Sequence, residues 1–342
     1  MPFLQDILKH KSVAIVGMAK NTGKTTCLNY VLDNLHKANK TIAVTSIGVD
    51  GEERDVLYDT LKPRIILRKG NYFITSEKHF EEKDLAAKIL HISNKLTALG
   101  PLLTAQVESE GKIILSGPSD SLWLQSCIDE LHNFNIDVVL VDGALSRMSL
   151  ASPAITDAMV LCTGAACSIN LDQLVKRIKY QSELININQV DNKLITVCDS
   201  IQEGVWGLSN NGDTYEKITE SLFLDFDMSP EKLAKYDYIF VNGALTERFM
   251  KYILTTVSDS KIKLIVRDFS RIFVNSASFK KFIHRGGSIE VMQKAKLLAI
   301  CTNPTSPEGY NFDPEVLRST VEKEINIPVF DIFQEIEKQK SR

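Results

Sequence analysis

The segment Val16–Thr26, which reads VGMAKNTGKTT, combines the residue types that bind a polyphosphate. Glycine lets successive backbone N–H groups turn toward an anion, and the start of a following helix supplies further free donors. The ammonium group of Lys24 can reach the β- and γ-phosphates as a mobile point charge. The hydroxyl group of Thr25 can ligate Mg²⁺. The spacing therefore predicts a site for a nucleoside triphosphate and Mg²⁺.

The same segment departs from the usual pattern G-x-x-x-x-G-K-T at one place, because Met18 stands where the first glycine belongs. We expect nucleotide contacts from Gly17, Lys20, Asn21, Thr22, Gly23, Lys24, Thr25 and Thr26. Some dimeric ATPases carry a second signature lysine five residues before the invariant one, which here is Ala19. Lys20 lies four residues before it, so we expect an added phosphate contact or a solvent-facing charge. Action of Lys20 across a homodimer is the alternative.

Two carboxylates are candidates for metal binding and catalysis beside Lys24. Asp142 directly follows the apolar run Val138–Val141. A carboxylate at the carboxyl end of a parallel strand faces the crevice where ligands bind, and there it can hold Mg²⁺. Asp50 lies in the acidic turn 48–53, where it could ligate Mg²⁺ or position the attacking water. Two glutamates of that turn are rivals for this role.

Strands alternate with helices along most of the chain. Short β-rich apolar runs at 13–16, 41–47, 136–141 and 159–162 predict buried strands, and helical spacing predicts helices over 24–39, 121–134 and 171–184. Such alternation is typical of an α/β fold with a mostly parallel sheet covered on both faces. We also expect a helix over 81–96, a hairpin joining 107–109 to 112–115, and a strand over 193–197.

A polar stretch near 203–232 predicts a division into two domains. Residues 1–225 form the expected nucleotide-binding α/β domain, and residues 226–342 form a smaller Rossmann-like α/β domain that binds a partner or ligand. The segments 137–146 and 237–246 read alike, with Asn242 in the position of Asp142. Coincidence and a degenerate duplication both explain this match.

Composition argues against several classes of partner. The 342 residues carry a formal net charge of −3, from 40 Lys and Arg against 43 Asp and Glu, without a dense basic run. We therefore expect neither nucleic acid nor membrane binding. The six cysteines form no C-x-x-C pair, which favours reduced core thiols. The apolar run Ser12–Gly17 is too short for a signal peptide, so the cytoplasm is the expected location.

Residues 10–200 resemble the SIMIBI class of P-loop NTPases in three respects. These are the loop ending in Lys24-Thr25, the strand end Asp142-Gly143 and the alternation of strands and helices. The class includes dethiobiotin synthetase, the molybdopterin cofactor accessory GTPases and MinD-type ATPases. The resemblance implies a mostly parallel sheet with Mg-nucleotide at its carboxyl edge.

A narrower resemblance covers most of the chain. The phrases SGPS (116–119), VDGALSR (141–147), SPAITD (152–157) and NPTSPEG (303–309) are similar to those of proteins encoded beside adenosylcobalamin-dependent lysine and ornithine aminomutases. Those proteins are described as reactivase components. The resemblance implies a chaperone-like ATPase that helps to exchange a damaged cobalamin on its partner enzyme.

Three functions fit these observations. The first is an accessory NTPase that couples hydrolysis to the conformation of a partner protein, suspected to be an aminomutase. The second is a ligase or kinase similar to dethiobiotin synthetase that acts on a small carboxylate. The third is a nucleotide-binding regulator with negligible turnover. We expect ATP as the nucleotide. GTP is the alternative, because the sequence shows no motif that reads the base.

Overall fold

The chain folds into two compact units in the computed structural model. The model describes residues 2–48, 54–55, 60–61, 64–118, 120–144, 152–220, 230–257 and 262–341. One unit comprises Met1–Lys179 together with Lys296–Arg342, and the other comprises Tyr180–Ala295. The units therefore do not divide at the boundary expected between residues 225 and 226.

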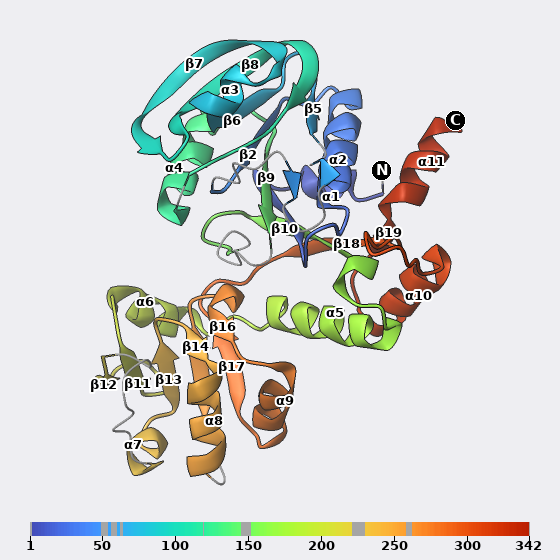
Figure 1. The fold of residues 1–342 in the computed structure, drawn as a ribbon. Coiled ribbons are helices and arrows are strands. Elements are labelled where there is room, and N and C mark those ends of the chain that lie inside the picture. The colour runs from blue at the N-terminus through green and yellow to red at the C-terminus, as the bar shows by residue number, and fades with distance from the viewer. Residues whose placement is uncertain are drawn as a thin grey trace. The chain divides into compact units, whose positions relative to one another are not determined.

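The first unit is built on a large sheet whose strands are mostly parallel (Figure 1). Within the described residues it has ten strands, in the order β19 (Val329–Asp331), β18 (Leu297–Asn303), β10 (Ala158–Gly164), β1 (Ser12–Gly17), β9 (Val138–Ala144), β2 (Ile42–Ser46), β6 (Tyr72–Ser76), β8 (Gly100–Ile113) and β5 (Ile65–Leu67), with β7 (Asp84–Thr97) paired to β8. The pairs from β19 to β6 are parallel, and β8 runs antiparallel to its neighbours. The expected α/β class with a mostly parallel sheet is confirmed.

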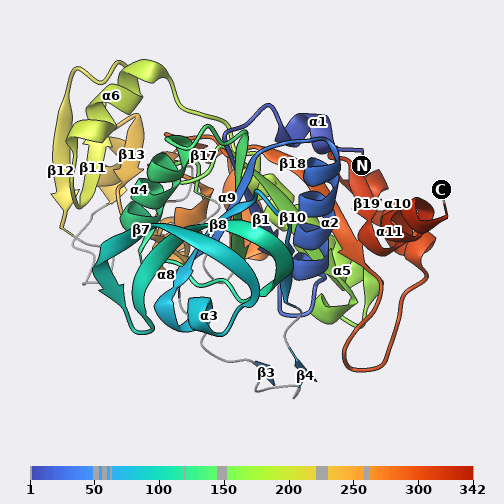
Figure 2. The same ribbon diagram turned by 90° about the horizontal axis from the view of Figure 1, so that it is seen from above.

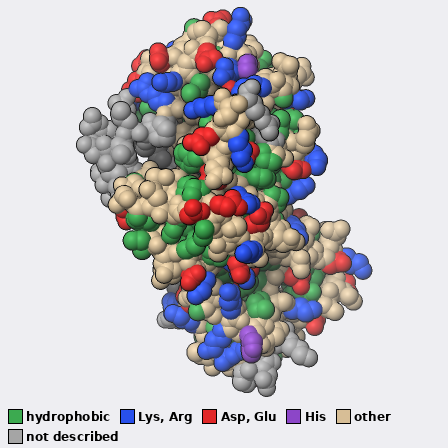
Figure 3. Space-filling view, turned by 90° about the vertical axis from the view of Figure 1, so that its right-hand side faces the viewer, with side chains coloured by type: hydrophobic (Ala, Val, Ile, Leu, Met, Phe, Trp, Pro, Cys, Tyr) green, Lys and Arg blue, Asp and Glu red, His purple; other side chains and the backbone are tan. Residues whose placement is uncertain are grey.

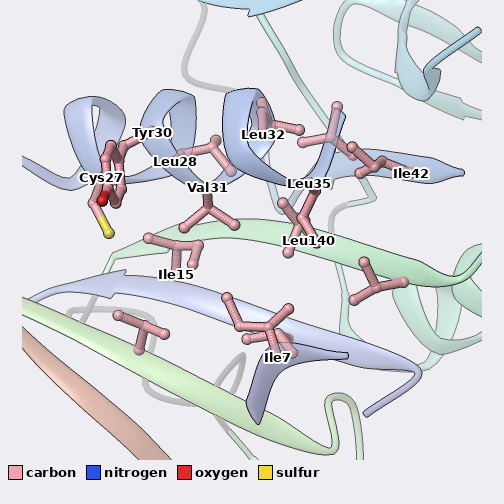
Figure 4. Packing of buried hydrophobic residues seen from close by; sticks show 14 of the residues in the cluster. Ile7, Ile15, Cys27, Leu28, Tyr30, Val31, Leu32, Leu35, Ile42 and Leu140 are labelled. Carbon is pink, nitrogen blue, oxygen red and sulfur yellow. The ribbon is translucent and has the colours of Figure 1, made fainter. Parts of the chain in front are cut away.

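Helices cover both faces of this sheet, which explains why the central strands read as continuous apolar runs. The helix α2 (Lys24–Lys37) packs with α1 (Leu4–Ile7) on one face, where Leu28, Val31 and Leu35 lie over Ile15 and Leu140 (Figure 4). The helix α4 (Ser121–His132) packs on the opposite face in a separate apolar cluster. The strand β1, which leads into the predicted nucleotide loop, is buried along its whole length.

The segment expected as a helix over 81–96 is mostly the strand β7, which begins at Asp84, so that prediction was wrong. It pairs with β8 as a long curved ribbon (Figure 2). Ile89, Ile92 and Leu96 are exposed on it, so their helical spacing does not mark a buried face. The hairpin turn expected near Gly111 is also absent among the described residues, because β8 continues through it. A Cβ atom on Gly111 would lie 1.7 Å from the carbonyl oxygen of Asp84, so this glycine permits close strand approach.

The second unit has its own mixed sheet, separate from the first. Within the described residues its order is β12 (Tyr215–Thr219), β11 (Val205–Leu208), β13 (Tyr238–Val241), β15 (Lys263–Val266) and β17 (Ser288–Val291). The helices of this unit include α6 (Asn192–Ser200), α7 (Pro230–Ala234), α8 (Glu247–Thr256) and α9 (Ser276–His284). The strand expected over 193–197 is part of α6, because Asp191 caps this helix and Leu194 and Cys198 bury one face.

The C-terminal segment completes the first sheet rather than the second unit. The strand β18 pairs with β10, so that Cys301 lies beside Cys162, and β19 pairs with β18. The helices α10 (Pro314–Glu324) and α11 (Ile332–Lys340) follow these two strands. The chain thus leaves the first unit in α5 (Leu171–Ile185) and returns at β18, which makes the second unit an insertion. Because of this pairing, residues 296–342 belong to the first unit, and the two units differ from the single division expected near residue 225.

Candidate functional site

The loop that follows β1 adopts the strand–loop–helix arrangement expected from the sequence. β1 ends at Gly17 and α2 begins at Lys24. Gly23 caps the helix with φ of 80°, a left-handed conformation that a residue with a side chain adopts only with strain. Asn21 also has a positive φ, of 61°. No side chain among the described residues caps α2, so the backbone N–H groups of its first turn are available to a ligand at the edge of the sheet.

Contacts within the described part of this loop fix its shape. The backbone N–H of Met18 donates to the carbonyl oxygen of Cys162 over 2.8 Å, so this amide joins the loop to β10. The hydroxyl group of Thr22 donates to the carbonyl oxygen of Ala19 over 3.0 Å, and Thr22 is only 2% exposed. Thr22 was expected to contact nucleotide, whereas here its side chain closes the loop. Met18 does not have a positive φ, so the backbone at this position does not require glycine.

The central feature of the site is the contact between Lys24 and Asp142. The Nζ atom of Lys24 lies 2.6 Å from Oδ1 of Asp142, and their side chains are 24% and 16% exposed. Asp142 lies near the end of β9, between Ile15 of β1 and Ser46 of β2 in the sheet register. The hydroxyl group of Ser46 donates to the carbonyl oxygen of Asp142 over 3.1 Å. The sheet thus brings a cation from the loop and a carboxylate from a neighbouring strand together.

The remaining expected residues have different surroundings. Thr25 and Thr26 lie half-buried in the first turn of α2, and Lys20 is exposed. Asp50 lies outside the described residues. Thr25 and Asp142 offer the hydroxyl and carboxylate oxygens that Mg²⁺ prefers, so the residues present fit this ion. Among the residues that the structure describes, no cluster of three or more His, Cys, Asp or Glu side chains could hold a metal by itself.

Asn303 contributes to the loop although sequence reasoning gave it no chemical role. It ends β18, and its Nδ2 atom donates to the carbonyl oxygen of Asn21 over 3.1 Å. Its Oδ1 atom accepts from the backbone N–H of Thr305 over 3.1 Å, which fixes the orientation of the amide. The signal in the sequence was a polar residue directly after a buried strand. That signal alone does not place Asn303 beside the loop, because the pairing of β18 with β10 is not evident from the sequence.

Three buried thiols lie beneath the loop. Cys27 in α2, Cys162 in β10 and Cys301 in β18 are each at most 2% exposed, and the sulfur atoms of Cys27 and Cys301 are 3.6 Å apart. Hydrogen bonding to Cys162 and burial raise the pKa of the Cys27 thiol well above its usual range, and burial does the same for the pKa of Cys301. Hydrogen bonds from Cys27 and Cys301 instead lower the pKa of Cys162 to about 5. All three thiols are buried, so the cluster packs the base of the loop.

A second loop borders the same edge of the sheet. The backbone N–H of Gly48 donates to the carbonyl oxygen of Pro118 over 2.7 Å, and that of Gly117 donates to the carbonyl oxygen of Gly48 over 3.1 Å. Ser116 is fully buried, and its hydroxyl group donates to the hydroxyl oxygen of Ser76 over 2.7 Å. The segment 116–118 therefore anchors the end of β2 beside β9.

Comparisons with protein-family models, with curated protein sequences and with solved structures gave no significant match. In the described parts of the chain, no helix combines the length and the apolar character needed to cross a membrane.

Proposed function

We propose that this protein binds a nucleoside triphosphate with Mg²⁺ at the loop 17–24 and hydrolyses it, with ATP as the preferred nucleotide. The observation that carries the proposal is the contact of 2.6 Å between Lys24 and Asp142 at the end of a strand–loop–helix unit. A lysine at the start of a helix and a carboxylate at the end of the neighbouring strand are groups that one class of phosphoryl-transfer enzyme uses to hold the phosphates and Mg²⁺.

Each group has a distinct role in this proposal. Lys24 would exchange Asp142 for the β- and γ-phosphate oxygens, and the free amides at the start of α2 would bind the same phosphates. Asp142 and Thr25 would hold Mg²⁺, which neutralises the phosphate charge when it is bound. Asn303 would act as a positioning residue, because its amide supports the backbone of the loop at Asn21.

We further propose that hydrolysis drives a conformational change in a partner enzyme, and that the partner is an adenosylcobalamin-dependent aminomutase. The sequence segments 116–119, 141–147, 152–157 and 303–309, which carry the resemblance to reactivase components, support this class of partner. The insertion Tyr180–Ala295 also supports an accessory role, because its described strands form their own sheet and none of them joins the sheet that contains Asp142. An insertion with its own core is a suitable element for contact with another protein.

The test is hydrolysis of ATP and of GTP by the purified protein with Mg²⁺, measured alone and with an aminomutase added. Slow basal turnover that rises when the enzyme is present supports both parts of the proposal. Turnover that does not change when the enzyme is added supports the NTPase activity but contradicts the aminomutase as partner. A small carboxylate then becomes the acceptor to test. No turnover of either nucleotide, with or without the enzyme, overturns the proposal as a whole.

A further inference from the structure

Phe333 is an exposed aromatic residue at the carboxyl edge of the first sheet. It lies in the first turn of α11, directly after β19 ends at Asp331. Its backbone N–H donates to Oδ1 of Asp331 over 2.9 Å, which holds this turn in place. Ile332 is buried, whereas Phe333 is 38% exposed. Figure 3 faces the side of the first unit on which α10 and α11 lie in Figure 1, and hydrophobic side chains reach the surface there among charged ones.

The helix α11 packs beside α2, which follows the loop 17–24. Both helices bury residues in the same apolar cluster. The Nε2 atom of Gln339 in α11 also donates to Oδ1 of Asn34 in α2 over 2.7 Å. A Cβ atom on Gly23 would lie 3.5 Å from Cε2 of Phe333, which is ordinary van der Waals contact. The ring of Phe333 therefore borders the loop at the residue that caps α2.

The order of the strands indicates which part of a nucleotide would reach Phe333. The sheet runs β19, β18, β10, β1 and β9, so Asp142 on β9 and Phe333 after β19 lie on opposite sides of the loop. The contact between Lys24 and Asp142 marks the proposed place of the γ-phosphate and Mg²⁺. The nucleoside is joined to the α-phosphate, at the other end of the phosphate chain. A triphosphate that crosses the loop from Asp142 therefore brings its nucleoside toward β18 and β19.

We propose that the ring of Phe333 is the surface on which the base of the bound nucleotide stacks. This inference rests on the proposed nucleotide site, which it extends from the phosphates to the base. An exposed aromatic ring suits this role, because every base has a π face and stacking tolerates a change of base. Phe333 therefore adds affinity for the nucleoside without choosing between adenine and guanine. Inorganic tripolyphosphate has no base, so its binding should not depend on Phe333.

The test compares AMP-PNP, a non-hydrolysable ATP analogue, with inorganic tripolyphosphate by isothermal titration calorimetry in the presence of Mg²⁺. Phe333→Ala removes the ring but keeps the backbone N–H that bonds to Asp331. We expect it to weaken AMP-PNP binding about fivefold or more, as the loss of stacking on one base does. The affinity for tripolyphosphate should stay unchanged. Phe333→Tyr retains an aromatic ring, and we expect it to keep the wild-type affinity for AMP-PNP.

A matched control separates this site from other effects of losing an exposed ring. Phe273→Ala removes an exposed phenylalanine from β16 (Ile272–Phe273) in the second unit, and we expect no change with either ligand. Equal losses for both ligands in Phe333→Ala would mean that the ring only supports the loop, and they overturn the inference. Unchanged AMP-PNP affinity in that variant, with native circular dichroism, overturns it as well. Binding of neither ligand by the wild-type protein instead contradicts the nucleotide site itself, and this inference with it.

Discussion

The ammonium nitrogen of Lys24 lies 2.6 Å from Oδ1 of Asp142, although 118 positions separate the two residues in the chain. Each side chain thereby neutralises the charge of the other at the edge of the sheet where ligands bind. A triphosphate would compete with Asp142 for Lys24, and Mg²⁺ would compete with Lys24 for Asp142. Nucleotide and metal binding should therefore depend on each other, because each releases a group that the other needs.

Lys24→Ala should weaken the binding of a fluorescent ATP analogue and reduce turnover to background. The expected loss of affinity is about ten- to hundredfold, because the variant removes a charged hydrogen bond to phosphate. Fluorescence anisotropy measures the affinity, and phosphate release measures turnover. Lys88→Ala is a suitable control, because Lys88 is exposed on β7. Unchanged binding in Lys24→Ala would show that the loop does not hold phosphate.

Asp142→Asn should mainly change the response to Mg²⁺. The amide is a weaker ligand than the carboxylate, so we expect a higher Mg²⁺ concentration at half-maximal turnover. The variant also frees Lys24, so binding of nucleotide without metal should be retained or strengthened. A Mg²⁺ titration of turnover tests this expectation. If the metal requirement stays the same, Asp50 becomes the candidate ligand in its place.

Local patterns predicted the centre of the first unit well. The strands β1 and β9, the helix α2 and the loop between β1 and α2 form where short apolar runs and helical spacing placed them. These elements are short and strongly patterned, and each is buried on the side that the pattern indicates. The segments 138–141 and 238–241 both lie in strands, β9 and β13, but in different sheets.

Contacts between distant parts of the chain could not be predicted in this way. The sequence of β7 has apolar residues at helical spacing, yet pairing with β8 along its whole length determines its structure. The return of β18 to the first sheet depends on its contact with β10, which no local pattern records. For that reason neither the insertion of the second unit nor the role of Asn303 in supporting the loop was foreseen.

Gly164→Ala should destabilise the first unit by about 1–3 kcal/mol or more, as overpacking of a buried site does. A Cβ atom at this position would lie 1.9 Å from the carbonyl oxygen of Asn303, so β10 and β18 would have to separate. Chemical denaturation monitored by circular dichroism measures the free energy of unfolding. Gly70→Ala is the matched control, because Gly70 has φ of 88° but no atom within 4 Å of the added Cβ. Equal losses in the two variants would mean that backbone conformation, rather than the close approach to Asn303, sets the cost.

The pH dependence of stability should reveal the burial of Asp331. Burial raises its pKa in the folded protein, with a smaller contribution from Glu337, while Lys338 and the N–H donors of α11 act in the opposite direction. Between the ordinary aspartate pKa of about 3.9 and this raised value, the folded state binds more protons than the unfolded state. The contribution of Asp331 to stability therefore falls as pH rises through that interval.

Asp331→Asn removes this titration, so the comparison isolates it from the other carboxylates. We expect the stability of the wild-type protein relative to the variant to decrease as pH rises through the interval and then to level off. Urea denaturation at a series of pH values measures this difference, and Asp129→Asn should give a flat difference, because Asp129 is exposed. A difference that rises with pH would mean that the ionised form of Asp331 is the stabilised one. In that case the Oδ2 atom of Asp331, which has no hydrogen-bond partner among the described residues, would have a donor in solution.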